Sequence, residues 1–209
     1  MSNGLRWIAT GYELGYTFTL CEGIGPRELL VRMGAELEHI HELTGDAVAE
    51  LQVWPEEGRL GGLDFLDGQD EALVARLTEA GFLFHPEVIV RVGMVPGWAY
   101  AIEDVSSRAT AFLPALSRGT RAYTVFRSVN AEHQIGYARE GQVLAYDEPG
   151  MPHLGGVGAQ EGVPGFVYSG EELADVAFLR FFEREHGICI VWEDTRAPLP
   201  TAAFAQASC

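Results

Sequence analysis

Lysine is missing from this sequence of 209 residues, because all 14 basic side chains are arginines. A Schiff base with pyridoxal phosphate needs a lysine amine. The phosphate-binding loop of Walker-type ATPases and the active site of protein kinases need one as well. The sequence therefore excludes these three classes of enzyme.

Long hydrophobic runs and cysteines are also scarce. The sequence has no uninterrupted run of about 18 apolar residues, the length that a transmembrane helix needs. Its first residues lack the basic and apolar segments of a signal peptide. Cys21, Cys189 and Cys209 are an odd set with no short pairing, which is typical of reduced thiols. We therefore expect a soluble, cytoplasmic protein without membrane contact, with Cys21 and Cys189 in its core.

Charge of one sign dominates the composition. The 30 acidic residues give a net charge of −16, which repels phosphate backbones and anionic membrane surfaces. General nucleic-acid binding is therefore not expected, whereas a basic protein partner would be attracted. The exception is the segment 105–131, here called the basic island, which holds four arginines and no acidic residue.

Local patterns predict an alternation of strands and helices. The expected strands are 16–21, 63–66, 88–93, 98–103, 120–129, 133–139, 142–147 and 188–192. The expected helices are 26–34, 44–51, 67–80, 114–119 and 169–187. Strands in succession, with helices before and after them, predict a single α+β domain over residues 1–196. Its largely antiparallel β-sheet is expected to be covered by helices mainly on one face.

Two segments are expected to be irregular. Residues 148–166 are rich in Gly and Pro, and a loop of this length is either a functional lid or mobile. Residues 197–209, with Pro198 and Pro200, are expected to form a flexible C-terminal tail.

A resemblance to a known family rests on several short motifs. They are Gly97-Trp98, Ala101-Ile102-Glu103, Leu116-Ser117-Arg118-Gly119-Thr120, Tyr137-Ala138 and Gly141, together with the helix 26–34. With these motifs the chain resembles DUF6461, an actinobacterial family of unknown function, over most of residues 10–195. The resemblance implies one domain in a bacterial cytoplasm and assigns no catalytic residue.

The basic island contains the best candidate for a ligand site. Arg118 is flanked by small and hydroxyl-bearing residues, and with Arg121 it could clamp a carboxylate or phosphate. Glu103 or His133 could transfer a proton there. The candidate ligand-binding residues are Trp98, Glu103, Ser117, Arg118, Arg121 and His133. The favoured alternative is that the arginines form structural ion pairs with the acidic first half of the chain.

No other pattern predicts a reactive group or a cofactor. His39 and His41 would share one face of a strand, but no third ligand has a recognisable spacing, so we expect no metal. Neither Cys21 nor Cys189 has the electropositive setting of a nucleophile, and a Gly-x-Ser-x-Gly motif is absent. Gly23-Ile-Gly25 lacks the third glycine of a dinucleotide-binding motif, so no cofactor is expected.

Two hypotheses about function follow. The first is a non-enzymatic, immunity-like module that recognises a basic protein through an acidic docking surface. The second is a small enzyme or metabolite sensor that holds a small anionic ligand in an arginine-rich pocket around Arg118, with residues 148–166 as a lid. The sequence favours the first, because it shows no standard catalytic motif.

Overall fold

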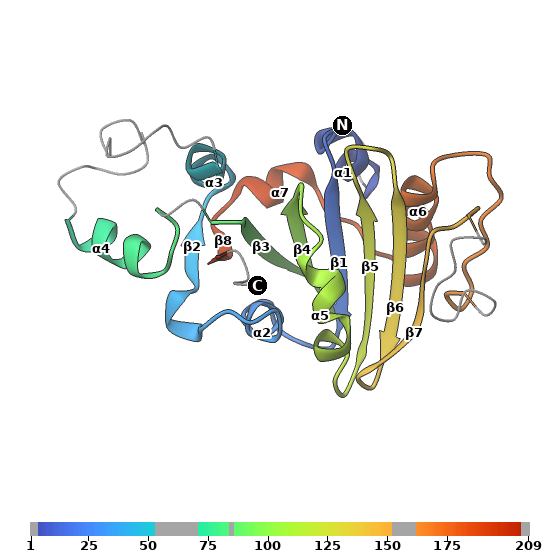
Figure 1. Cartoon of the computed structure of the whole chain (residues 1–209), viewed down its shortest axis with the longest axis horizontal. Coiled ribbons are helices and arrows are strands. Elements are labelled where there is room, and N and C mark those ends of the chain that lie inside the picture. Colours follow the sequence, from blue (N-terminus) through green and yellow to red (C-terminus); the bar gives the residue numbers. More distant parts are fainter. Residues whose placement is uncertain (1–3, 53–70, 84–85, 152–161, 206–209) are drawn as a thin grey trace.

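An eight-stranded sheet forms the centre of the computed structural model, which describes residues 4–52, 71–83, 86–151 and 162–205 (Figure 1). The strands are β1 (Tyr16–Glu22), β2 (His41–Leu43), β3 (Val88–Val95), β4 (Trp98–Asp104), β5 (Arg121–Arg127), β6 (His133–Arg139), β7 (Gln142–Asp147) and β8 (Leu199–Phe204). The helices are α1 (Arg6–Gly11), α2 (Pro26–Arg32), α3 (Gly45–Gln52), α4 (Glu71–Glu79), α5 (Arg108–Leu116), α6 (Ala174–His186) and α7 (Trp192–Arg196). The predicted strand 63–66 lies outside the described residues.

The strands follow the order β2-β8-β3-β4-β1-β5-β6-β7, and every neighbouring pair is antiparallel. The predicted α+β class and antiparallel sheet are therefore confirmed. The hairpin predicted around Pro96-Gly97 joins β3 to β4, and Gly97 has the positive φ, 81°, that such a turn requires. Because this loop has two residues, Val95 pairs with Trp98 and the register of the hairpin is fixed.

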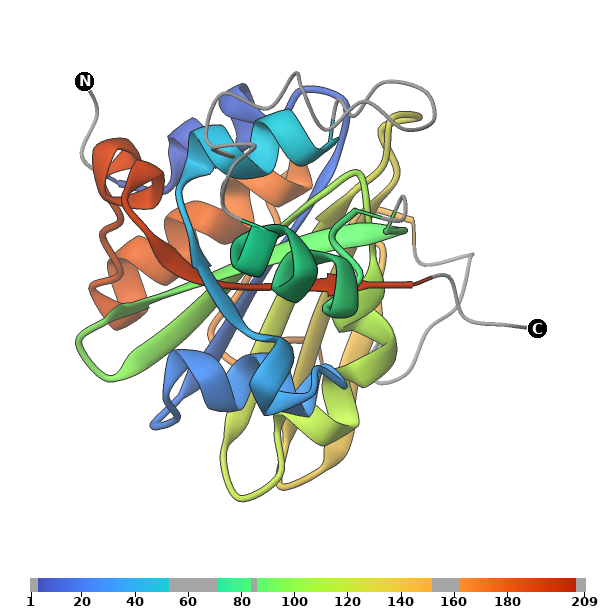
Figure 2. The same ribbon diagram turned by 90° about the vertical axis from the view of Figure 1, so that its left-hand side faces the viewer.

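Helices cover both faces of the sheet, and not mainly one face as the sequence suggested (Figure 2). Helices α2 and α5 pack on one face, against a cluster in which β4 and β5 contribute small side chains such as Ala99, Ala101 and Ala122. Helices α1 and α6 pack on the other face, against aromatic side chains that include Phe18 and Tyr123. Both sides of β1 and β4 are accordingly buried, since each side carries apolar side chains that need a cover.

The edge of the sheet formed by β2, β8 and β3 has a cover of its own. Helices α3 and α4 pack there against Leu43 and Ile89. Helix α3 begins where the sequence predicted, because the Thr44 hydroxyl accepts a hydrogen bond of 3.1 Å from the Ala47 amide.

The predicted flexible tail is wrong for residues 199–204. These residues form β8, which pairs with β2 on one side and with β3 on the other. Pro200 is compatible with this position because the ladder to β3 begins only at Thr201, so a missing amide at Pro200 breaks no bond to β3.

The predicted strand 188–192 and the predicted burial of Cys189 are also wrong. Ile188 and Ile190 are buried, but the segment forms no strand, and Cys189 between them is exposed. Helix α7 follows from Trp192. Buried and exposed side chains still alternate along this segment, so that Ile188 and Ile190 lie in the core as they would in a strand.

Helix α6, with 13 residues, is the longest helix of the described part. It ends at Gly187, which adopts the left-handed conformation that the sequence predicted for a helix terminator. Within the ranges that the structure describes, no helix is both long and apolar enough to span a membrane.

Candidate ligand-binding site

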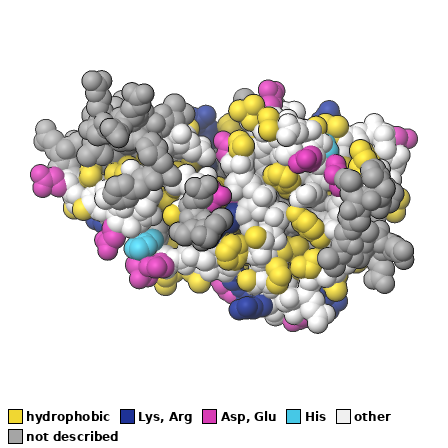
Figure 3. Space-filling view, in the orientation of Figure 1, with side chains coloured by type: hydrophobic (Ala, Val, Ile, Leu, Met, Phe, Trp, Pro, Cys, Tyr) yellow, Lys and Arg dark blue, Asp and Glu magenta, His cyan; other side chains and the backbone are white. Residues whose placement is uncertain are grey.

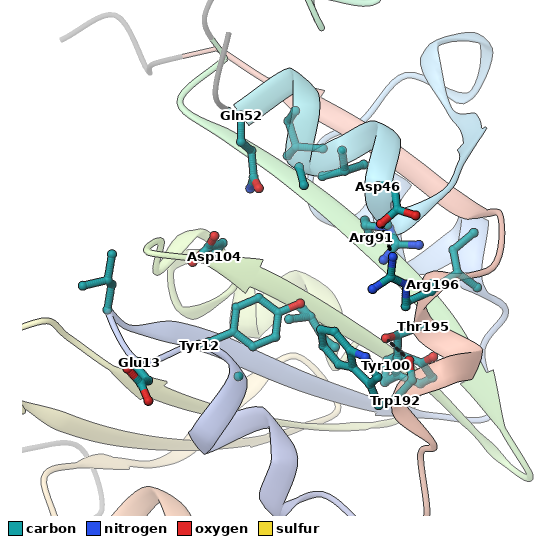
Figure 4. Close-up of a pocket in the computed structure, with 18 residues that line it drawn as sticks. Tyr12, Glu13, Asp46, Gln52, Arg91, Tyr100, Asp104, Trp192, Thr195 and Arg196 are labelled. Atoms are coloured by element: carbon teal, nitrogen blue, oxygen red, sulfur yellow. Dashed lines mark hydrogen bonds and ion pairs between the residues drawn. The ribbon is translucent and has the colours of Figure 1, made fainter. Parts of the chain in front are cut away.

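A cavity of about 350 Å³ lies on the face of the sheet that carries α1 and α6 (Figure 4). Its floor is formed by β3, β4 and β8, and its walls by α3, α7 and the residues that follow α1. The apolar lining includes Val48, Ile89, Ile102, Leu199 and Trp192. The volume is at the small end of the range of ligand sites, which is roughly 300–1,000 Å³.

Arg91 provides a half-buried positive charge at the floor of this cavity. Its Nη2 donates hydrogen bonds to the carbonyl oxygens of Ala197 at 2.9 Å and Leu43 at 3.4 Å. Its Nε is buried and has no hydrogen-bond partner among the described residues, and no described carboxylate forms an ion pair with Arg91. Burial lowers the pKa of Arg91 from its ordinary value, although a guanidinium remains protonated.

A glycine makes room for this guanidinium. A Cβ atom at Gly45, the first residue of α3, would lie 3.2 Å from Arg91 Nη1 and 3.4 Å from the backbone of Arg196. The glycine thereby lets α3 approach Arg91 closely.

Two tyrosines supply phenol groups to the same space. Burial raises the pKa of Tyr100 to about 12 and also raises the pKa of Tyr12. Both phenols therefore remain protonated and can donate a hydrogen bond. Tyr100 lies across its partner Gly93, where an added Cβ would come within 2.2 Å of the Tyr100 hydroxyl oxygen. The absence of a side chain at Gly93 thus leaves room for the Tyr100 ring over the sheet.

Three carboxylates line the cavity and differ in exposure and in ion pairing. Asp46 of α3 forms an ion pair with Arg196 of α7, and both side chains are more than half exposed. Glu13 is exposed. Asp104, at the end of β4, is half-buried and has no hydrogen bond or ion pair to the described part of the chain. Burial raises the pKa of Asp104.

The sequence matches the model of DUF6461, a family of unknown function, over residues 4–156. The chain belongs to DUF6461. No curated protein and no solved structure gave a match. The region matched by DUF6461 contains Tyr12, Arg91, Tyr100 and Asp104 of the cavity, whereas α7 with Arg196 lies beyond it.

Of the six residues predicted from the sequence of this DUF6461 member, Trp98 and Arg121 lie together. The Arg121 guanidinium lies 5.2 Å from the centre of the Trp98 ring. Arg121 also donates to both carboxylate oxygens of Glu22, at 2.5 and 2.8 Å. This is the structural pairing with the acidic first half of the chain that was the favoured alternative.

Glu103 lies on the opposite face of β4 from Trp98, because the two positions are five residues apart in one strand. Its carboxylate is fully buried and accepts hydrogen bonds from the Ala109 amide at 2.9 Å and the Ser106 hydroxyl at 3.0 Å. Burial raises the pKa of Glu103 to about 7, although these hydrogen bonds and Arg108 act to lower it. Glu103 therefore binds the N-terminal end of α5 and is not next to Trp98.

Ser117 and Arg118 form no pocket with the others. The Ser117 hydroxyl is buried between the Pro114 carbonyl and the Gly141 amide, where it links α5 to the turn between β6 and β7. Arg118 is exposed, and its guanidinium has no hydrogen bond or ion pair to the described residues.

His133 belongs to a buried cluster around Asp175 of α6. Its Nδ1 lies 3.2 Å from Asp175 Oδ1. Tyr16 donates to Asp175 Oδ2 at 2.8 Å, and Arg127 Nη1 lies 3.4 Å from the same oxygen. Burial alone would raise the pKa of Asp175, but His133, Tyr16 and Arg127 together hold it below its usual value. This cluster fastens α6 to the sheet.

No cluster of three or more potential metal ligands was found among residues 4–52, 71–83, 86–151 and 162–205. His39 lies 3.5 Å from Glu36, and the His41 ring packs edge-on against Phe82. Of the predicted lid, residues 152–161 lie outside the described residues.

The sequence did give a signal for the residues that were missed. Arg91 interrupts a run of β-branched residues, which is unusual for a strand buried on both sides. The two-residue turn at Pro96-Gly97 also fixes which residues of the hairpin share a face, so Arg91, Tyr100 and Asp104 could have been placed together. The contribution of α3 and α7 has no local signal.

Proposed function

We propose that this protein binds a small anionic ligand in the cavity over β3 and β4, with Arg91 as its anchor. The observation that carries the proposal is a half-buried guanidinium that faces a cavity and has no carboxylate partner in the described chain. Charged groups that are taken out of water are normally paired, because an unpaired one costs several kcal/mol. A ligand carboxylate or phosphate would supply the missing charge.

The surroundings of Arg91 fit such a ligand. Protonated phenols of Tyr12 and Tyr100 offer neutral donors, which an anion accepts without a further charge being buried. The apolar wall around Val48 and Ile102 accommodates a hydrocarbon portion. The arrangement resembles ligand sites in general, which combine apolar walls with a few convergent polar groups.

The docking of a basic protein on an acidic surface stays a prediction from the net charge. In Figure 3 the acidic side chains are scattered over the visible face, separated by neutral and hydrophobic groups. No single patch on that face therefore favours one docking surface over the cavity.

The proposal is tested by thermal denaturation of the wild type in the presence of a panel of small carboxylates and phosphates. A ligand at about 100 times its dissociation constant stabilises the native state by roughly 2.7 kcal/mol. We expect such a shift in the wild type and none in Arg91→Met, a variant of similar length without the charge. Circular dichroism checks that the variant is folded.

Arg118→Gln is the matched control, because Arg118 is an exposed arginine without a partner among the described residues. We expect it to respond to the ligand as the wild type does. Loss of the response in Arg118→Gln, with Arg91→Met unaffected, would move the site to the basic island. Silence of the wild type across the panel would refute the proposal.

A further inference from the structure

Asp104 is the second half-buried charged group in the cavity that has no charged partner in the described part of the chain. Of the other two lining carboxylates, Asp46 is paired with Arg196, and Glu13 is exposed to water. Asp104 is half-buried and interacts with no described side chain through a hydrogen bond or an ion pair. Among the described residues, the cavity therefore contains two half-buried charged groups without an ion pair, the positive Arg91 and the negative Asp104.

The two groups line the same cavity from neighbouring strands. Arg91 pairs with Ile102 in the hairpin, and Asp104 is two residues further along β4 on the same face. Such diagonal neighbours in an antiparallel pair have Cα atoms about 7–8 Å apart. Tyr12 reaches toward this space from the segment after α1 (Figure 4), and its hydroxyl is close enough for its pKa to respond to both charges.

We infer that the ligand is dipolar, with an amino group that pairs with Asp104 as well as an anionic group that pairs with Arg91. This inference rests on the proposed function and specifies its ligand class. A purely anionic ligand would neutralise Arg91. It would also displace water from the Asp104 carboxylate without offering that carboxylate a hydrogen-bond donor, which costs free energy. A dipolar ligand compensates both groups at once.

Amino acids with an apolar or aromatic side chain fit this description. Their ammonium and carboxylate groups offer one charge of each sign, one for Asp104 and one for Arg91. Their side chains match the apolar wall that includes Val48, Ile89 and Trp192. The limited volume of the cavity, about 350 Å³, is consistent with a ligand of this size.

The test is isothermal titration of the wild-type protein with the twenty standard amino acids and with the desamino carboxylates of the apolar ones, such as 3-phenylpropionate for phenylalanine. We expect at least one amino acid to bind about tenfold or more tightly than its desamino analogue, since a charge-assisted hydrogen bond contributes about 1.5–3 kcal/mol. Asp104→Asn should remove this difference and leave binding of the carboxylate unchanged.

Three variants separate this inference from the proposed function. Arg91→Met should lose both the amino acid and the carboxylate, whereas Glu172→Gln, which alters a carboxylate paired with Arg180 outside the cavity, should still prefer the amino acid. If Asp104→Asn proves unstable, Asp104→Ser serves in its place. Equal binding of amino acids and desamino carboxylates, or binding of other anions alone, would overturn the dipolar ligand and keep the anion site. Absence of any binding would overturn both.

Discussion

Arg127 and Arg91 lie on the same face of the sheet, and both donate hydrogen bonds to backbone carbonyl oxygens. Arg127 binds those of Ala9 and Tyr12, and Arg91 binds those of Leu43 and Ala197. The difference lies in the counter-charge. Arg127 has the buried carboxylate of Asp175 within 3.4 Å, whereas Arg91 has no such group among the described residues.

This difference distinguishes a structural charge from one that is available to a ligand. Around Arg127, Tyr16 and His133 complete a cluster that satisfies both charges inside the protein. Around Arg91, the corresponding space is a cavity. The same type of side chain therefore anchors α6 to the sheet in one place and lines a cavity in the other.

Removing the counter-charge of Arg127 should have the largest effect. We expect Asp175→Asn to lower the free energy of unfolding by about 3–5 kcal/mol, because it leaves Arg127 buried without its partner. Urea denaturation at pH 7 measures this loss. A loss below about 1 kcal/mol would mean that the backbone carbonyls alone satisfy Arg127, and the comparison with Arg91 would fail.

Glu103 tests whether a buried carboxylate can be satisfied by a backbone amide and a hydroxyl, without an ion pair. Its pKa is about 7 in the native state and about 4.3 in the unfolded chain. Between these values the native state holds more protons, so the free energy of unfolding falls as the pH rises. The full pKa difference corresponds to about 4 kcal/mol, most of which is lost between pH 4.5 and pH 7.5.

Glu103→Gln removes this titration. Relative to the wild type, the variant should therefore gain about 3 kcal/mol in stability between pH 4.5 and pH 7.5. Urea denaturation at both pH values gives the difference, and its magnitude does not depend on the cost of the substitution itself. Parallel pH dependence of the two proteins would show that the Ala109 amide and the Ser106 hydroxyl satisfy the carboxylate fully.

The fold was predictable where the pattern is local. The strands around residues 16–21, 88–93 and 98–103 follow from alternation and from the Pro96-Gly97 turn. Strand β8 was missed because Pro198, just before it, and Pro200, its second residue, suggested a loose tail. Its pairing also depends on partners more than 100 residues away in the chain. Local sequence carries no information on such pairing.

The candidate site was less predictable than the fold, for a physical reason. Arg91 and Asp104 share a face that follows from the hairpin register, but whether a charge is compensated depends on contacts between distant segments. The contact of Arg127 with Asp175 spans 48 residues, and that of Asp46 with Arg196 spans 150. The predicted site also combined Trp98 with Glu103, which an odd spacing in one strand places on opposite faces.

Replacing each arginine in turn tests the difference between Arg91 and Arg127 directly, and Arg91→Met is the first variant. We expect it to change the free energy of unfolding of the ligand-free protein by about 1 kcal/mol or less. Two hydrogen bonds to carbonyls are lost, but no buried carboxylate is left unpaired. Arg127→Met should cost about 3 kcal/mol or more, because Asp175 remains. Urea denaturation of the two variants side by side gives the ranking, and equal losses would contradict it.

The ion pair between Asp46 and Arg196 should have the smallest effect. It connects α3 to α7 at the cavity, but the two side chains are 68% and 51% exposed, so water and salt screen their attraction. We expect Asp46→Asn to lower the free energy of unfolding by about 0–1 kcal/mol at low ionic strength and by less in 1 M NaCl. Urea denaturation at both salt concentrations measures this. A loss of several kcal/mol that salt does not reduce would show that the contact between α3 and α7 holds the cavity together, and the site would then depend on a second charge pair besides Arg91 and its ligand.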